Sequence, residues 1–270
     1  MSPVAERSTM DWEAAGRAWG ARARDWAYLF EPYARPANEL VFDRLGVGPG
    51  DRFLDIACGA GLAAQHASRR GATVSGLDAA PALVRVAGAR TPSGDFRVGN
   101  MFCLPFDDGS FDVVTSFNGI WKGCEAALEE AWRVLVPGGR LGLTFWGRYE
   151  HLGLLGYFAK IIELSPPDHG ETTLSQGDTG TPGVAEEMLD AAGFDVVDRG
   201  TVTVVNEWPD VEIALRALTA AGPCAPAIEA VGLDAVRAAL REVIEPMQVP
   251  DVGIRIASEF AWITAARRAG

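Results

Sequence analysis

The alternation of short apolar segments with helical segments after residue 51 is the feature that most constrains the fold. Strands are expected over residues 52–57, 72–77, 96–98, 111–117 and 140–146. Helices are expected between them, over residues 62–70, 81–90 and 125–135. Strands and helices alternating at this spacing are typical of βαβ units with a parallel sheet. The sequence therefore predicts an α/β fold, a Rossmann-like sandwich with a mostly parallel seven-stranded sheet.

The chain after residue 147 has a looser pattern. Residues 165–183 are polar and rich in glycine, proline and threonine, so a loop is expected there. The other expected elements are helices over 152–164, 183–192, 211–221 and 233–244, and strands over 194–205 and 254–264. This order predicts a helical insertion before the last strand, over about residues 150–250.

Aromatic side chains are concentrated near the N-terminus, where residues 1–45 are predicted to be helical. They are Trp12, Trp19, Trp26, Tyr28, Phe30 and Tyr33. One interpretation is a lid that folds over a bound ligand and excludes water, with Trp26 and Tyr28 as its contacts. The alternative is an amphipathic helix that only packs on the core.

Charge and composition argue against several functional classes. The net charge is −12 and the isoelectric point is near 4.7, whereas nucleic acids and anionic membranes select clustered lysine and arginine. No apolar stretch is long enough to span a bilayer, and the first residues do not resemble a signal peptide. The four widely spaced cysteines and three histidines form no metal-binding pattern. We expect a cytoplasmic protein with reduced thiols, for which a homodimer is a possible assembly.

A glycine-containing turn over residues 54–64 joins the first expected strand to its helix. Gly59, Gly61 and Ala64 fit the dinucleotide pattern G-x-G-x-x-G/A, and Asp78 lies 19 residues after Gly59. A nicotinamide cofactor is therefore a competing interpretation. Asp55 argues against it, because a carboxylate beside the turn favours a cationic ligand over a diphosphate. The alternative role of Asp55 is structural, capping the loop.

The residues Asp55-x-Ala57-x-Gly59-x-Gly61 resemble motif I of the class I S-adenosylmethionine-dependent methyltransferases, with alanine in place of the commoner first glycine. Further family motifs are matched in order by residues 76–78, 99–106, 111–114 and 133–141. The resemblance covers about residues 45–147. Within the family, the chain is most similar to the branch that acts on quinones and natural products.

The resemblance implies S-adenosylmethionine as cofactor and S-adenosylhomocysteine as product. The residues expected to bind it are Asp55, Ala57, Gly59, Gly61, Asp78, Ala79, Asn100, Met101, Phe117 and Asn118. The family usually has aspartate at Asn100, whose amide oxygen is still an acceptor for the adenine amino group. A metal is not expected, because Phe117 and Asn118 end the fourth strand where metal-dependent relatives carry acidic residues.

The acceptor is expected at the carboxyl ends of the fourth and fifth strands, where open α/β sheets bind ligands. His151 is the candidate general base, and the alternative is an exposed histidine at a helix start. Trp121 and Trp146 are candidate walls of the acceptor pocket, and the alternative for both is core packing. Four functions remain open: methyl transfer to a small molecule, a rearrangement or cyclisation on the same fold, nicotinamide-dependent oxidoreduction, and non-enzymatic sensing of S-adenosylmethionine.

Overall fold

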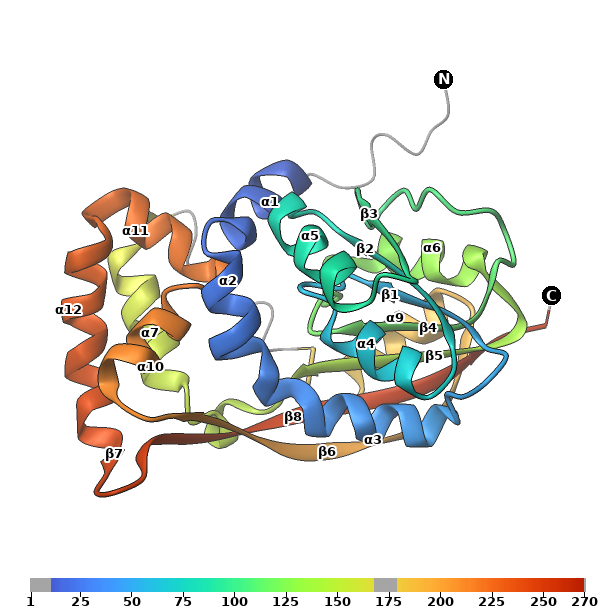
Figure 1. Cartoon of the computed structure of the whole chain (residues 1–270). Helices are drawn as coiled ribbons and strands as arrows, with labels where there is room; N and C mark the ends of the chain where they lie inside the picture. The colour runs from blue at the N-terminus through green and yellow to red at the C-terminus, as the bar shows by residue number, and fades with distance from the viewer. Residues whose placement is uncertain (1–10, 168–178, 270) are drawn as a thin grey trace.

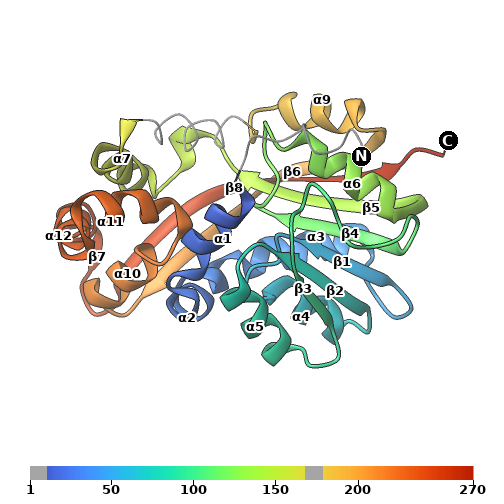
Figure 2. The same ribbon diagram turned by 90° about the horizontal axis from the view of Figure 1, so that it is seen from above.

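The computed structural model describes residues 11–167 and 179–269. Most of the loop expected over residues 165–183 lies outside these ranges. The described chain contains one mixed sheet, with helices on both of its faces and a further helical group at one end (Figures 1 and 2).

The sheet confirms the predicted α/β fold but differs in strand number. The strand order is β3-β2-β1-β4-β5-β8-β6, with β1 to β5 parallel and β8 antiparallel to both neighbours. The strands are β1 (Arg52–Ile56), β2 (Thr73–Asp78), β3 (Asp95–Val98), β4 (Phe111–Phe117), β5 (Leu135–Trp146), β6 (Phe194–Trp208), β7 (Gln248–Val249) and β8 (Gly253–Arg267).

The prediction of seven strands was wrong, because the sheet has eight. The additional strand, β7, is two residues long and pairs with the start of β8. Asp251 and Gly253 adopt positive φ angles of 62° and 106°, which turn the chain back on itself before β8. A strand is predicted from alternating apolar and polar residues, and a hairpin this short is too brief to show that alternation.

The helices cover the two faces of the sheet in separate sets. Figure 2 shows α6 (Glu125–Val134) and α9 (Val184–Ala191) on one face. The other face carries α3 (Arg35–Leu45), α4 (Leu62–Arg69) and α5 (Pro81–Arg90). Alternate residues of a strand point to opposite faces. Accordingly Leu54 and Ile56 of β1 pack in the cluster that includes α6, while Phe53 packs in the cluster that includes α3 and α4.

A helical group packs on the far ends of β6 and β8 (Figure 1). It consists of α7 (Leu155–Leu164), α10 (Val211–Leu218), α11 (Ala225–Val231) and α12 (Leu233–Ile244), with the short 3-10 turns η6 (Gly222–Cys224) and η7 (Glu245–Met247). The helices α10 to α12 lie between β6 and β8 in the chain, so the structure contains helices where the insertion was predicted.

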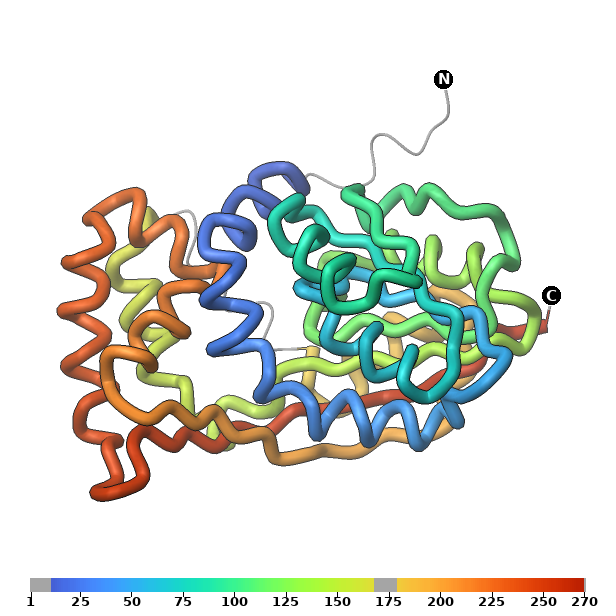
Figure 3. The backbone as a smooth tube through the Cα atoms, in the orientation of Figure 1, coloured from blue at the N-terminus to red at the C-terminus, as the bar shows by residue number. Residues whose placement is uncertain are grey.

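The N-terminal segment runs between this helical group and the sheet (Figure 3). It comprises α1 (Trp12–Gly20), α2 (Ala23–Asp25), the π-helical η2 (Trp26–Phe30) and the 3-10 turn η3 (Glu31–Ala34). The helix α1 contacts α5 and η6, and η2 contacts α10. The segment therefore touches both the sheet layer and the helical group.

The described residues include no single helix that is long and apolar enough to cross a membrane. The pair 211–218 and 222–231 meets the length and composition criterion only jointly and is bent by 87°.

Candidate functional site

The glycine turn after β1 has backbone angles that residues other than glycine rarely adopt. Ala57, Gly59 and Gly61 have φ angles of 56°, 55° and 78°. A Cβ atom on Gly61 would lie 2.7 Å from the Cβ of Ala87, so this glycine permits α4 to pack on α5. A Cβ on Gly59 would instead lie 3.2 Å from Glu31 Oε1 and 3.6 Å from Trp26 Nε1. Gly59 thus faces the N-terminal segment, whereas Gly61 faces the protein interior.

Three buried carboxylates surround this turn. Asp55, on β1, accepts a hydrogen bond of 2.7 Å from the Thr115 hydroxyl. Asp78, at the end of β2, accepts 2.8 Å bonds from the backbone N–H groups of Gly59 and Ala80. Glu31, on η3, accepts a 2.9 Å bond from the N–H of Ala60. The carboxylates of two strands and of the N-terminal segment therefore converge on the turn.

Arg90 is the cation that the structure pairs with this cluster. Its guanidinium forms an ion pair with Glu31 and donates to the carbonyl oxygens of Ala60, at 2.9 Å, and Ala27, at 2.5 Å. It also lies 5.3 Å from the centre of the Tyr28 ring. Because Arg90 is paired with Glu31, Asp55 and Asp78 give the cluster an excess of negative charge when they are ionised.

Burial and mutual repulsion shift the proton equilibria of the three carboxyls. Burial raises the pKa of Asp55 to about 8, and the nearby charges of Glu31 and Asp78 contribute to this rise, against the Thr115 bond. Burial also raises the pKa of Asp78 and of Glu31, although the Arg90 charge opposes the shift at Glu31. A cation entering this site would stabilise the ionised forms.

The residues expected at the nucleoside end come after β2 and β3. The side-chain oxygen of Asn100 accepts a 2.9 Å bond from the N–H of Phe102, which leaves its amide N–H groups for other partners. Met101 is partly buried against the core cluster that includes α6. Ala79 lies directly beneath α1, because a Cβ on Gly16 would come within 2.1 Å of its carbonyl oxygen.

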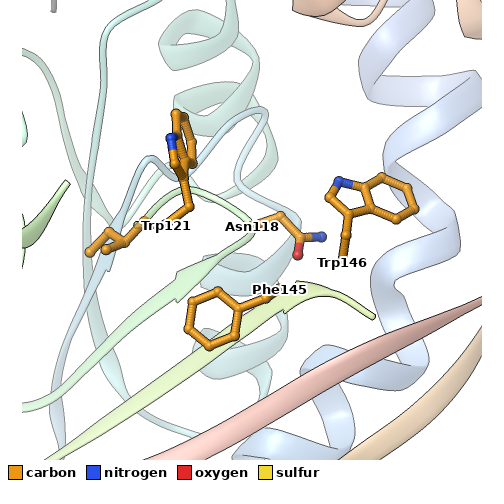
Figure 4. Close-up of a pocket in the computed structure, with 5 residues that line it drawn as sticks. Asn118, Trp121, Phe145 and Trp146 are labelled. Carbon is orange, nitrogen blue, oxygen red and sulfur yellow. The ribbon is translucent and has the colours of Figure 1, made fainter. Parts of the chain in front are cut away.

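A pocket opens at the carboxyl ends of β4 and β5. It is lined by Asn118, Ile120, Trp121, Phe145 and Trp146. Figure 4 shows the Asn118 amide directed toward Trp146, with Trp121 on the other side of Asn118.

Aromatic rings extend this pocket beneath the N-terminal segment. The Tyr33 and Trp146 rings are stacked with centroids 6.1 Å apart, and Phe260 packs edge-on to Trp146 at 4.9 Å. The Tyr33 side chain also forms a hydrogen bond with Asn118, and burial raises the pKa of its phenol.

Three expected site residues lie in other surroundings. The His151 side chain is 43% exposed, and its Nδ1 lies 3.1 Å from Glu259 Oε1, outside the residues that line the pocket. Tyr28 is 64% exposed beside Arg90. The Phe117 ring packs edge-on to Phe42 of α3, 5.7 Å between centroids, on the face of the sheet that carries α3. Their roles in binding or catalysis stay predictions.

Within the part of the chain that the structure describes, no group of three or more histidine, cysteine, aspartate or glutamate side chains is arranged to hold a metal ion.

Comparison with protein families assigns the core of this site. Residues 54–143 match the family model described as a methyltransferase domain. This segment is a methyltransferase domain. It contains the glycine turn, Asp55, Asp78, Asn100, Asn118 and Trp121, and it ends within β5. The mostly parallel sheet described above agrees with the Rossmann-like fold that the sequence analysis predicted.

Curated relatives match parts of the chain of different length. An uncharacterised protein of Mycobacterium tuberculosis is 34% identical over 172 residues, which make up 62% of this chain and 60% of that protein. A demethylmenaquinone methyltransferase of Renibacterium salmoninarum is 40% identical over 106 residues, 38% of this chain and 45% of that enzyme. The chain thus spans less than two thirds of the length of these relatives.

Solved structures of similar fold include a putative methyltransferase and a cyclase. A putative methyltransferase from Bacillus halodurans superposes with a TM-score of 0.58 at 17% identity, covering 87% of this chain and all of that one. The [4+2]-cyclase SpnF superposes with a TM-score of 0.57 at 21% identity, covering 88% of this chain and 82% of that one. At these identities the comparison establishes the fold alone.

The site of the methyltransferase domain fits the family's cofactor, S-adenosylmethionine, in two respects. The excess of buried negative charge at the turn suits an ammonium and a sulfonium. The buried Trp26 Nε1, which faces Gly59, has no hydrogen-bond partner, and neither has the buried Ser116 hydroxyl beside Gly119 and Ala57. A polar ligand at the turn would supply such partners.

Glu31, Arg90 and Tyr33 are site residues that the sequence analysis did not identify. Glu31 and Tyr33 lie in the aromatic N-terminal segment, and Arg90 is the last residue of α5. The sequence does hold one signal for Glu31: it is an acidic residue that comes directly after the apolar run Trp26–Phe30. Its partner, 59 residues away, is brought to it only by the packing of the N-terminal segment on the sheet.

Proposed function

We propose that this protein is an enzyme that binds S-adenosylmethionine at the glycine turn and transfers its methyl group to a small-molecule acceptor. The observation that carries the proposal is the cluster of three buried carboxyl groups, Glu31, Asp55 and Asp78. Of these, Glu31 is ion-paired with the Arg90 guanidinium. A diphosphate would be repelled by this cluster, which argues against the nicotinamide-dependent alternative.

The proposed roles of the cofactor-binding residues reflect their positions. When bound, S-adenosylmethionine supplies a methyl group that is activated by the positive sulfur. Asp55 and the turn residues Ala57, Gly59 and Gly61 hold its amino-acid end. Asp78, Ala79, Asn100 and Met101 hold its nucleoside, and Phe117 and Asn118 border it from β4.

Positioning is the main demand of methyl transfer, because the nucleophile, methyl carbon and sulfur must lie in line. Good alignment contributes about 7–11 kcal/mol to such reactions. The rings of Tyr33, Trp146 and Phe260, with Trp121 on the other side of Asn118, form a largely apolar wall for the acceptor. This wall supports an acceptor with a flat apolar body, and the similarity to a demethylmenaquinone methyltransferase makes quinone-like compounds the first choice.

The N-terminal residues 1–45 act in this proposal as a lid, and about residues 150–250 complete the acceptor pocket. The contacts of η2 with α10 and of α1 with α5 support a lid that joins both sides of the site. His151 remains the candidate base for a protonated nucleophile. Its Nδ1 contacts Glu259, which orients the ring, but an acidic phenol or carbon acid needs no such base.

The test combines cofactor binding with methyl transfer. Calorimetric titration with S-adenosylhomocysteine is expected to show binding, and titration with NADH is expected to show none. Incubation with methyl-labelled S-adenosylmethionine and a panel of phenols, quinones and polyketides should transfer label to at least one compound. Binding of NADH without binding of S-adenosylhomocysteine would refute the proposal.

A second candidate function is a rearrangement or cyclisation that keeps the cofactor but transfers no methyl group. The structural likeness to the [4+2]-cyclase SpnF is the observation in its favour. Mass spectrometry of the products separates the two, because methyl transfer adds one CH₂ unit to the acceptor's mass. A product of unchanged mass would favour the second candidate.

A further inference from the structure

Glu31 and Arg90 tie the N-terminal segment to the glycine turn. Their side chains are only 9% and 13% exposed. Glu31 accepts from the Ala60 N–H, while Arg90 donates to the Ala60 carbonyl oxygen and to the Ala27 carbonyl oxygen of η2. We call Glu31 and Arg90 the latch. Separating a buried ion pair would leave two uncompensated charges, which is strongly unfavourable. The latch therefore stabilises the position of η2 relative to the turn.

Trp26 is the side chain that this arrangement places over the turn. Its ring is stacked on Phe30, 4.9 Å between centroids, and packs edge-on to Trp19 at 4.7 Å. Its Nε1 is buried without a hydrogen-bond partner and lies 3.6 Å from the Cβ position of Gly59. A buried N–H without an acceptor is unfavourable, so this donor is suited to an acceptor atom on a ligand.

The amino-acid end of the proposed cofactor carries two opposite charges that need different partners. Its ammonium suits the acidic cluster, but its carboxylate is repelled by Asp55 and Asp78, whereas the charge of Glu31 is paired with that of Arg90. That carboxylate therefore needs a donor on the side of the turn that faces away from Asp55 and Asp78. The indole N–H of Trp26 is such a donor, supplied by the segment that packs over Gly59.

We propose that the latch holds Trp26 over Gly59 so that its indole N–H donates a hydrogen bond to the carboxylate of the cofactor's amino-acid end. This inference rests on the proposed function. Trp26 is then a cofactor-binding residue from outside the family domain of residues 54–143, and Glu31 and Arg90 are positioning residues that act through it. The acceptor wall described above includes neither the latch nor Trp26.

The test compares two ligands that differ at the amino-acid end. S-adenosylhomocysteine has this end, and 5′-methylthioadenosine lacks it but keeps the nucleoside and the sulfur. Trp26→Phe retains a ring and removes the N–H. It is expected to weaken binding of S-adenosylhomocysteine by about tenfold or more, the loss typical of a hydrogen bond to a charged group, and to leave 5′-methylthioadenosine unchanged. Trp19→Phe, in the same aromatic cluster, is the matched control and should leave both affinities unchanged.

The latch is tested by Arg90→Lys, alone and combined with Trp26→Phe, because this change keeps the positive charge but removes the fork of donors that joins Glu31, Ala60 and Ala27. Alone it should weaken S-adenosylhomocysteine selectively, and in the double variant it should add little to the loss, because both changes remove the same contact. Circular dichroism and thermal melts establish that each variant is folded. Equal weakening of both ligands by Trp26→Phe, or no weakening, would overturn the inference. Failure of the wild-type protein to bind S-adenosylhomocysteine would instead overturn the proposed function.

Discussion

At the scale of single residues, the site is defined by acids that are buried without enough positive charge. Asp55 accepts one side-chain hydrogen bond, and it lies near Glu31 and Asp78 in a region where water does not screen their repulsion. Such an arrangement reduces the stability of the unliganded protein and favours a cationic ligand. Binding residues are often kept at this kind of cost to stability.

Replacing Asp55 with asparagine separates these two effects. The asparagine side chain retains an oxygen that can accept the Thr115 hydroxyl but carries no charge. At pH 8 we expect Asp55→Asn to raise the thermal midpoint of the unliganded protein and to weaken S-adenosylhomocysteine by about tenfold or more. Differential scanning calorimetry and titration calorimetry measure the two effects. The hypothesis would be contradicted by a variant of lower stability or of undiminished affinity.

Asp112→Asn is the matched control for this change. Hydrogen bonds from Arg52 lower the pKa of Asp112, which lies far more exposed than Asp55. Removing this charge should cost about 0–1 kcal/mol of stability, as is usual for surface ion pairs, and should leave cofactor affinity unchanged.

At the scale of elements, the glycine turn has two different tasks. Gly59 leaves room on the side of the N-terminal segment, whereas Gly61 lets α4 approach α5 at Ala87. Both glycines fit the sequence motif equally well, and only their neighbours distinguish them. The family pattern therefore combines a residue at the ligand site with a residue for helix packing.

Gly61→Ala tests the packing role. The added Cβ would meet the Ala87 Cβ at 2.7 Å, and φ is 78°. Backbone strain and overpacking together are expected to lower the free energy of unfolding by roughly 2–4 kcal/mol, and the thermal midpoint by about 5–15 °C.

Gly88→Ala, one residue from Ala87 on α5, provides the contrasting substitution. A Cβ at Gly88 meets nothing within 4 Å, so this change should stabilise the helix by about 0.5–1 kcal/mol. If both variants melted at the wild-type temperature, the assigned role of Gly61 would be wrong.

At the scale of the whole molecule, the acidic cluster links stability to pH. A carboxyl group with a raised pKa keeps its proton up to a higher pH in the folded chain than in the unfolded chain. Its contribution to stability is complete below the unfolded pKa, near 3.8, and is lost as pH rises through the folded pKa, about 8 for Asp55. His66 has the opposite effect on the pH dependence of stability. Burial lowers its pKa below 6.5, so its contribution to stability is lost as the pH falls.

Between pH 6.5 and 8 the carboxyl effect should therefore dominate. Over this window the free energy of unfolding of the unliganded protein is expected to decrease, and the stabilisation by saturating S-adenosylhomocysteine is expected to increase. Chemical denaturation at pH 6.5, 7.25 and 8, with and without the ligand, measures both slopes. Asp55→Asn should flatten them. Slopes that are equal in the wild-type protein and the variant would show that Asp55 is not the titrating group.

The sequence by itself determined the parallel core, the glycine turn and the positions of Asp55 and Asp78. These features are local: strand and helix periodicity, a turn motif and a fixed spacing specify them within about thirty residues. The same local rules missed β7, because a two-residue strand has no period.

Only the tertiary structure decided what covers the glycine turn. Glu31 meets Arg90 across 59 residues, and Tyr33 meets Trp146 and Phe260 across longer separations still. These contacts depend on the path of the N-terminal segment between the sheet and the helical group. An apolar helical pattern indicates that such a segment packs, but not against which surface, because many surfaces bury the same apolar area equally well.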